Sequence, residues 1–373
     1  MRRIIGVALS TLLVLGMLGV GAWQLLGGRL PSRAGAASPQ GASSPANLAA
    51  VRAVVGSEKK AFFADPDVKA IFARSGISVD VDTAGSREIA TSTDLKARLG
   101  VPLLGTSSRA NQAQDRDSRG LFTVLLANGD RVLPADRRSP GTGRVAKKAP
   151  AGYWTFDVNA YLKLVAKGTR WDQIPGNTSY PATKTILVTT TDVRRSNSAA
   201  MYLAMASYAA NGNRIVSSHN ETSAVLPAMR RLFLGQGFTE SSTEAPFEDY
   251  LALGEGKTPI LLTYESLFLD RQLRKDGSIS KDMVLMYPTP DVLSKHTVLA
   301  LTKQGAKVGE LLSQDPDLQR LAAQYGFRTT NPTTFRDTLT KAQVALPPEL
   351  MNIVEPPSYE VLESMIAALE KQY

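Results

Sequence analysis

The stretch that decides the fold runs from Ile186 to Tyr202 and reads ILVTTTDVRRSNSAAMY. It begins as an apolar, β-branched run, passes through a short polar loop and continues with residues that favour a helix. Similar junctions occur near Val55–Ser57, Val81–Ser86 and Leu262–Tyr264. Strands that alternate with helices predict an α/β fold with parallel sheets, in which ligands bind beyond the carboxyl ends of the strands. We therefore expect the polar residues of the four junctions to line one binding cleft.

Ten residues at or near these junctions are candidate ligand-binding residues. They are Ser57, Ser86, Arg87, Asp192, Ser196, Asn197, Ser198, Tyr264, Glu265 and Tyr287. A serine before a helix can instead be an N-cap, worth about 1 kcal/mol, and this alternative applies to Ser57 and Ser86. Three adjacent polar residues at 196–198 exceed what one cap needs, which favours ligand contact there. For Tyr264, the alternative to ligand binding is an ordinary place in the hydrophobic core with its hydroxyl hydrogen-bonded.

The charge of the ligand stays open at this stage. Arg87, Arg194 and Arg195 are able to bind an oxyanion or a carboxylate through charge-assisted hydrogen bonds. Glu265 beside Tyr264 would repel a small anion unless an arginine neutralises it. The sequence therefore predicts a small polar ligand without fixing its class.

The pattern from residue 189 to residue 202 resembles the strand, polar loop and helix that open the second lobe of type 2 periplasmic solute-binding proteins. This class includes the molybdate, sulfate and phosphate receptors of ABC importers. Segments 259–265 and 284–290 resemble its ligand-facing tyrosine and its hinge return, and Ser57 and Ser86 resemble its two first-lobe serines. The resemblance covers about residues 51–327. It implies a two-lobed α/β fold that closes like a hinge on its ligand, and an ABC-transporter permease or another envelope protein as partner.

The body of the chain is long enough for two lobes, because roughly 320 residues after position 50 exceed what one hydrophobic core usually serves. The first lobe would comprise residues 50–180 and 283–373, and the second residues 181–282. Segment 106–150 contains nine Arg and Lys against four Asp and is rich in Gly, Pro and Ser. This composition predicts a solvated basic insertion in the first lobe.

The N-terminus carries an uncharged apolar run from Ile4 to Leu26. As a helix it would extend about 34 Å, enough for a hydrocarbon core of about 30 Å. We expect residues 1–28 to form a single transmembrane anchor in the cell membrane with the body outside the cytoplasm. A cleaved signal peptide, which would give a secreted protein, is the alternative. Residues 29–49 are expected to form a flexible linker.

The composition excludes several classes of site. The chain has no cysteine and two histidines, so a lipidated cysteine, disulfides, thiolate zinc sites and a histidine-rich metal site are excluded, and we predict neither a metal nor a cofactor. The net charge of +9 falls largely in segment 106–150, which lacks aromatic residues for base stacking other than Phe122. We therefore expect no nucleic-acid partner for an exported body.

An enzymatic reading rests on Ser57–Lys60, which matches the S-x-x-K pattern of penicillin-recognising acyl enzymes. Pro259 stands where the accompanying K-T-G pattern needs glycine, so we predict no enzyme. Another alternative is a surface-anchored interaction protein of the same fold that docks an envelope partner through its basic insertion. Further strands are expected at 185–190 and 297–301, and helices at 157–167, at 198–210 and from 358.

Overall fold

The computed structural model describes residues 48–91, 121–128, 145–175, 177, 180–237, 239–347 and 352–373. The expected anchor or signal, residues 1–28, lies outside these residues, as does nearly all of the expected linker. The linker ends earlier than expected, because Ala49 already belongs to strand β1. In the part of the chain that is described, no helix combines the length and the apolar character that a membrane crossing needs.

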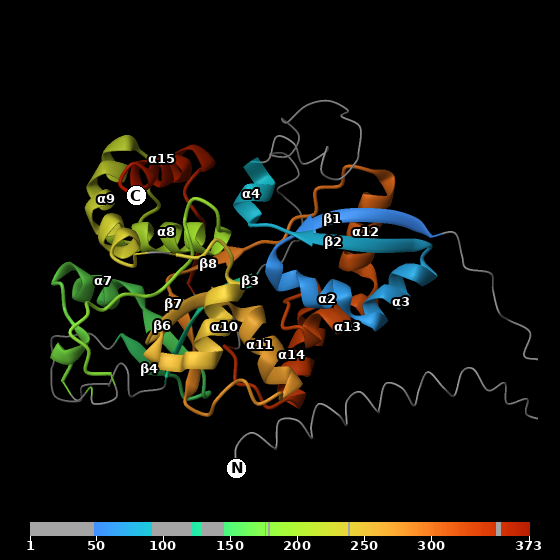
Figure 1. Ribbon diagram of the computed structural model, residues 1–373, viewed down its shortest axis with the longest axis horizontal. Coiled ribbons are helices and arrows are strands. Elements are labelled where there is room, and N and C mark those ends of the chain that lie inside the picture. Colours follow the sequence, from blue (N-terminus) through green and yellow to red (C-terminus); the bar gives the residue numbers. More distant parts are fainter. Residues whose placement is uncertain are drawn as a thin grey trace, which may run out of the picture. The chain divides into compact units, whose positions relative to one another are not determined.

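The first sheet consists of two parallel strands, β1 (Ala49–Val55) and β2 (Ile77–Thr83), which pair along their whole length (Figure 1). They are connected by η1 (Ser57–Lys59), α2 (Lys60–Ala64) and α3 (Pro66–Arg74), and α4 (Ser86–Thr91) follows β2. The expected β-α-β-α order is thus confirmed. The hydrophobic core beside this first sheet also includes residues of α12 (Lys303–Gln314) and α13 (Pro316–Gln324).

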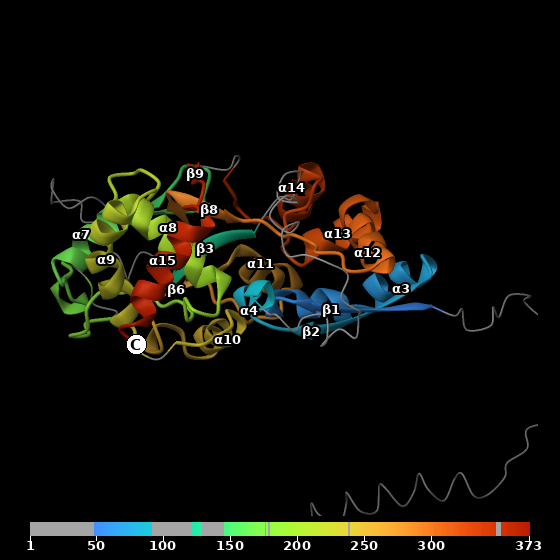
Figure 2. The ribbon, with the colours of Figure 1, turned by 90° about the horizontal axis from the view of Figure 1, so that it is seen from above.

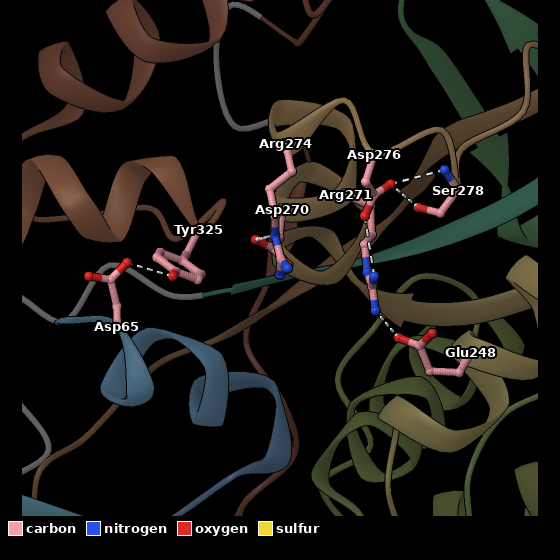
Figure 3. Close-up of polar contacts among 8 residues, drawn as sticks. All are labelled: Asp65, Glu248, Asp270, Arg271, Arg274, Asp276, Ser278 and Tyr325. Atoms are coloured by element: carbon pink, nitrogen blue, oxygen red, sulfur yellow. Dashed lines mark hydrogen bonds and ion pairs between the residues drawn. The ribbon is translucent and has the colours of Figure 1, made fainter. Parts of the chain in front are cut away.

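Asp65 sets the boundary between α2 and α3. Its side chain accepts hydrogen bonds from the backbone N–H groups of Asp67 and Val68, and Pro66 occupies the first position of α3, where no N–H is needed. The other carboxylate oxygen of Asp65 accepts a 2.7 Å hydrogen bond from the hydroxyl of Tyr325, which follows α13 (Figure 3). The helix break that the sequence shows at this position therefore also fixes α13 against α3.

The second sheet is mixed, not purely parallel as expected. Its strands are β3 (Leu121–Asn128), β4 (Ala146–Lys148), β5 (Trp154–Asp157), β6 (Ile260–Tyr264), β7 (Met283–Thr289), β8 (Asp291–Ser294) and β9 (Ile353–Val354). The order is β4-β5-β7-β3-β8-β9, and β6 pairs with β3. Strand β3 is antiparallel to β6, β7 and β8. The basic segment 106–150 supplies this central strand and also β4.

Helices α7 (Val158–Ala166), α8 (Asn197–Ala210), α9 (His219–Leu234) and α15 (Tyr359–Glu370) share the largest core with the second sheet. Helices α8, α9 and α15 lie side by side in both views (Figures 1 and 2). The expected lobe boundaries put α7 and α15 in the first lobe and α8 in the second, whereas all three helices contribute to this one core. The lobe boundaries themselves stay a prediction.

A third core lies among α10 (Glu244–Leu253), α11 (Glu265–Arg274), α13 and α14 (Pro332–Lys341). The last turns of α11 carry charged pairs at its surface (Figure 3). Arg274 binds Asp270 one turn earlier, with Nε 2.7 Å from Oδ1, and Arg271 binds Glu248 of α10. Exposed pairs of this kind contribute about 0.2–1 kcal/mol each, so the core packing dominates here.

Two of the expected strands do not form. Segment 185–190 makes only single bridges, one of them between Thr189 and Leu261 of β6. Side chains satisfy the neighbouring backbone groups instead: the N–H of Val188 donates to the hydroxyl of Tyr161, at 3.0 Å, and that of Thr190 to Gln236. Segment 297–301 also has no strand, and Val298 and Leu299 within it are exposed. Its β-branched residues favour a strand, but no described strand pairs with them.

Candidate functional site

Four polar residues meet at the end of β6, and we call them the Tyr264 cluster: Asn197, Ser198, Tyr264 and Ser294. Tyr264 is the last residue of β6 and only 4% exposed. Burial and the negative charge of Glu58 raise the pKa of its phenol, whereas hydrogen bonding with Asn197, Ser294 and Ser198 works in the opposite direction. The phenol is therefore neutral at physiological pH and is able to donate a hydrogen bond.

Hydroxyl and amide groups from separate segments connect the cluster. The Nδ2 of Asn197 donates to the Oγ of Ser294 at 2.9 Å. The Oγ of Ser198 lies 2.8 Å from that of Thr191, 2.9 Å from that of Thr243 and 3.0 Å from that of Ser196. Ser198 is fully buried, so these contacts give it the partners that a buried hydroxyl requires. The junctions at residues 186–202 and 260–265 thus meet at Tyr264, and the binding cleft expected there stays a prediction.

The first junction reaches the same place through the hydroxyl run 241–243. The Oγ of Ser57 lies 2.9 Å from the Oγ of Ser242, the neighbour of Thr243. Ser57 does not cap its helix, because the N-cap residue of η1 is Gly56. The carboxylate of Glu58 folds back over this glycine, where an added Cβ atom would lie 2.4 Å from Oε2. Any larger residue at position 56 would therefore displace Glu58 from the site.

The junction at residues 81–87 contacts the loop before α8 through Gly85 and through the predicted residue Arg87. The backbone of Gly85 lies against Arg195, whose carbonyl oxygen would be 2.6 Å from a Cβ atom added at Gly85. The guanidinium of Arg87 forms a bidentate pair with Glu363 of α15, with Nη2 2.8 Å from Oε2, and its Nε donates to the carbonyl of Arg194 at 3.3 Å. Ser86 begins α4, and its side chain lies outside what the structure describes.

Asp192 organises the loop between the bridge at Thr189 and helix α8. Its carboxylate binds the guanidinium of Arg194, with Nη2 2.6 Å from Oδ2, and also accepts the backbone N–H of Arg194. Burial raises the pKa of Asp192, but these hydrogen bonds outweigh burial and hold it below its usual value. The Arg194 guanidinium also lies 4.5 Å from the ring centroid of Tyr373. The negative charge of Asp192 is thus neutralised within the loop by Arg194.

Glu265 and Tyr287, two of the predicted ligand-binding residues, bind each other and an arginine. Glu265 is fully buried, and Arg328 holds both of its oxygens, with Nε 2.7 Å from Oε2 and Nη2 2.8 Å from Oε1. The Tyr287 hydroxyl donates to Oε1 at 2.6 Å. Burial, and then the negative charge of Glu265, raise the pKa of Tyr287. An arginine does neutralise Glu265, but it is Arg328 and none of the three arginines considered from the sequence.

The sequence did not point to one member of the Tyr264 cluster, Ser294. It also did not point to four residues near the cluster, Glu58, Ser242, Thr243 and Arg328. Two of the segments had a usable signal, because Ser241–Thr243 is a hydroxyl run directly before α10 and Ser294 ends β8. Across the described residues, histidine and acidic side chains form no group of three that could hold a metal ion. A separate hollow of about 340 Å³ at the ends of β5 and β7 shares no residue with the cluster.

We expect Arg87 to couple energetically to Glu363. Because the pair is bidentate and partly buried, Arg87→Ala should lower the free energy of unfolding by about 1–3 kcal/mol. A double-mutant cycle with Glu363→Gln, measured by urea denaturation, should give a coupling of at least about 0.5 kcal/mol. Arg195→Ala, a neighbouring exposed arginine, is the control and should change stability by less than about 0.5 kcal/mol. A coupling near zero would show that the pair is incidental.

No protein-family model and no curated protein matches the chain. Solved structures align with it at low identity. An ABC substrate-binding protein from Listeria monocytogenes in complex with cycloalternan is 14% identical, with a TM-score of 0.46 over 87% of this chain and 98% of that chain. A periplasmic solute binding protein from Pectobacterium atrosepticum is 12% identical, with a TM-score of 0.43 over 87% and 93%. Both alignments cover most of this chain.

An enzyme is also among the aligned structures. A eukaryotic thiaminase-I bound to the thiamin analogue 3-deazathiamin is 11% identical, with a TM-score of 0.35 over 80% of this chain and 90% of that chain. In the present chain, the Oγ of Ser57 pairs with a serine and Lys60 is exposed. The S-x-x-K pattern is therefore not accompanied by the serine–lysine contact that its chemistry uses.

Proposed function

We propose that this chain is an extracytoplasmic solute-binding protein that binds a small polar ligand at the Tyr264 cluster and performs no reaction on it. The convergence of Ser57, Asn197, Tyr264 and Ser294 supports the proposal, because these residues come from four distant segments. Burying hydroxyl and amide groups costs free energy unless each finds a partner, so a purely structural contact would more simply be apolar. Polar groups that converge from several loops are typical of ligand sites.

Charges around the cluster favour an uncharged ligand. Apart from the exposed Arg195, the candidate charged residues from the sequence are paired: Arg87 with Glu363, Asp192 with Arg194, and Glu265 with Arg328. A charged ligand that bound to any of these paired groups would have to break the pair and leave a charge without its partner, which costs several kcal/mol where the charge is buried. Hydroxyl and amide groups of a neutral ligand need no such exchange.

The N-terminal segment gives the proposal its cellular setting. We infer from the apolar run at residues 4–26 that the chain is held in the cell membrane with its body outside the cytoplasm. A permease of an ABC importer or another envelope protein would then be its partner. Cleavage of the segment would release the body as a secreted protein, and the ligand site would be the same in both forms.

One observation favours the interaction protein as a second candidate. The polar side chains expected to bind ligand are bonded to one another, as in the contact between Ser57 and Ser242 and the pair between Arg87 and Glu363. Such contacts connect the segment that contains β1 and β2 directly to the loop before α10 and to α15. A protein that only docks a partner would need no more than this.

A thermal-shift screen of the purified full-length chain in detergent separates the two candidates. A ligand that binds the native state alone should stabilise it by about 2.7 kcal/mol at a concentration one hundred times its Kd. The panel contains maltose, glucose, sorbitol, amino acids, sulfate and phosphate. We expect an uncharged compound to raise the Tm and sulfate not to. A cooperatively folded protein whose Tm responds to no compound would favour the interaction protein.

A further inference from the structure

A buried nitrogen near the Tyr264 cluster has no hydrogen-bond partner in the described part of the chain. Among the residues that the structure describes, no group hydrogen-bonds to the buried Nε2 atom of His296. Most buried polar atoms in proteins have a partner, and an exception calls for an explanation. A hydroxyl can rotate towards a weak acceptor, whereas an imidazole nitrogen points where its ring is held.

The packing of His296 places it beside the cluster. His296 follows Ser294 by two residues, and Ser294 accepts the hydrogen bond from Asn197. Its ring meets Phe327 edge-on, with 5.8 Å between centroids, and Phe327 belongs to the same hydrophobic core as Tyr264. The adjacent residues Glu58 and Lys59 act electrostatically on Tyr264 and on His296, respectively. The rings of Tyr264 and His296 therefore both lie near the turn at Glu58 and Lys59.

The charge state of His296 limits what it can bind. Burial, and then the positive charge of Lys59, lower the pKa of the imidazole well below its ordinary value, so it is neutral at physiological pH. Lys59 itself is paired with Glu58. A neutral imidazole offers one donor and one acceptor, and a hydroxyl group matches either of them because it both donates and accepts.

We propose that His296 is a further ligand-binding residue of the Tyr264 cluster and that its Nε2 forms a hydrogen bond with a hydroxyl group of an uncharged ligand. This inference rests on the proposed function, whose site it extends. It accounts for a buried polar atom that the described residues leave without a hydrogen bond. It also predicts that an apolar residue at this position is compatible with the fold and incompatible with tight binding.

The histidine content of the chain makes this directly measurable. His296 and His219 are the only two histidines, and His219 is exposed at the start of α9. Nitrogen-15 labelling of histidine in the full-length protein therefore gives two sets of ring signals, with His219 as the internal reference. Maltose, glucose and sorbitol are the uncharged probes, and sulfate is the charged one. We expect at least one uncharged probe to shift the Nε2 signal of His296 without shifting that of His219, and sulfate to shift neither.

Variants supply a second readout with the same probe. We expect His296→Leu to weaken binding of the uncharged probe about tenfold or more without lowering the Tm of the free protein. His296→Gln should restore part of the affinity for that probe. His219→Leu should bind as the wild type does. Unchanged affinity in His296→Leu, an unmoved His296 signal, or a shift by sulfate alone would overturn the inference. A probe that raises the Tm while His296 stays unmoved would overturn it and leave the proposed function standing, whereas no Tm response to any compound would overturn both.

Discussion

Arg328→Ala is expected to lower the free energy of unfolding by about 3–5 kcal/mol. The variant leaves the carboxylate of Glu265 buried, with 0% of its surface exposed, and removes the guanidinium that binds both of its oxygens. A carboxylate without a counter-charge pays a desolvation cost that the hydroxyl of Tyr287 does not offset alone. Urea denaturation followed by circular dichroism measures the loss.

The matched control is Arg271→Ala, which removes an arginine of α11 that binds the carboxylates of Glu248 and Asp276 (Figure 3). These two pairs lie at the surface. We expect a loss of about 0.2–1 kcal/mol there. The double variant Glu265→Gln with Arg328→Met should recover much of the stability, because it removes both charges together and keeps an acceptor for Tyr287. Equal losses for Arg328→Ala and Arg271→Ala would mean that the buried pair carries no special weight.

The same double variant reports on function. Glu265 and Tyr287 were predicted from the sequence to bind ligand, and their contact with Arg328 suggests a supporting role beside the Tyr264 cluster. If that role is structural, the folded double variant should retain the affinity of the wild type. A large loss of affinity with the fold intact would return Glu265 to the ligand site.

Asn197→Ala is expected to weaken ligand binding by about 1–3 kcal/mol, roughly five- to a hundred-and-fifty-fold. The variant removes an amide that donates to Ser294 and hydrogen-bonds with Tyr264. Asn197 is the first residue of α8, and Ser196 is its N-cap residue, so the change removes no helix cap. Isothermal titration calorimetry with the compound that raises the Tm most measures the loss.

Asn159→Ala provides the comparison for Asn197→Ala. Asn159 lies in the first turn of α7 and donates one exposed hydrogen bond to Asn213, so the same chemical change occurs away from the cluster. We expect its affinity to equal that of the wild type. A lowered Tm in Asn197→Ala together with unchanged affinity would assign the residue a structural role only.

The sequence by itself determined the local elements and the type of residue at the junctions. Helix α8 begins at the predicted polar loop. The Asp65–Pro66 pair marks the boundary between α2 and α3, because the aspartate caps α3 and the proline occupies its first position. These features depend on groups a few residues apart: a side-chain oxygen that caps nearby N–H groups, a proline that fixes one dihedral angle, and an apolar period. Such short-range effects can be read without knowing the rest of the fold.

The tertiary structure alone decided which partner each polar group has. Ser57 meets Ser242 across 185 positions, Glu265 meets Arg328 across 63, and Arg87 meets Glu363 across 276. The sequence showed that a buried Glu265 needs a cation but offered several arginines, and only packing selects one. Strand β3 is central because β6, β7 and β8 all form backbone hydrogen bonds with it. Residues 185–190 form no strand, and side chains accept hydrogen bonds from the N–H groups of Val188 and Thr190. Burial makes each polar group take a partner, and the folded chain determines which partner is within reach.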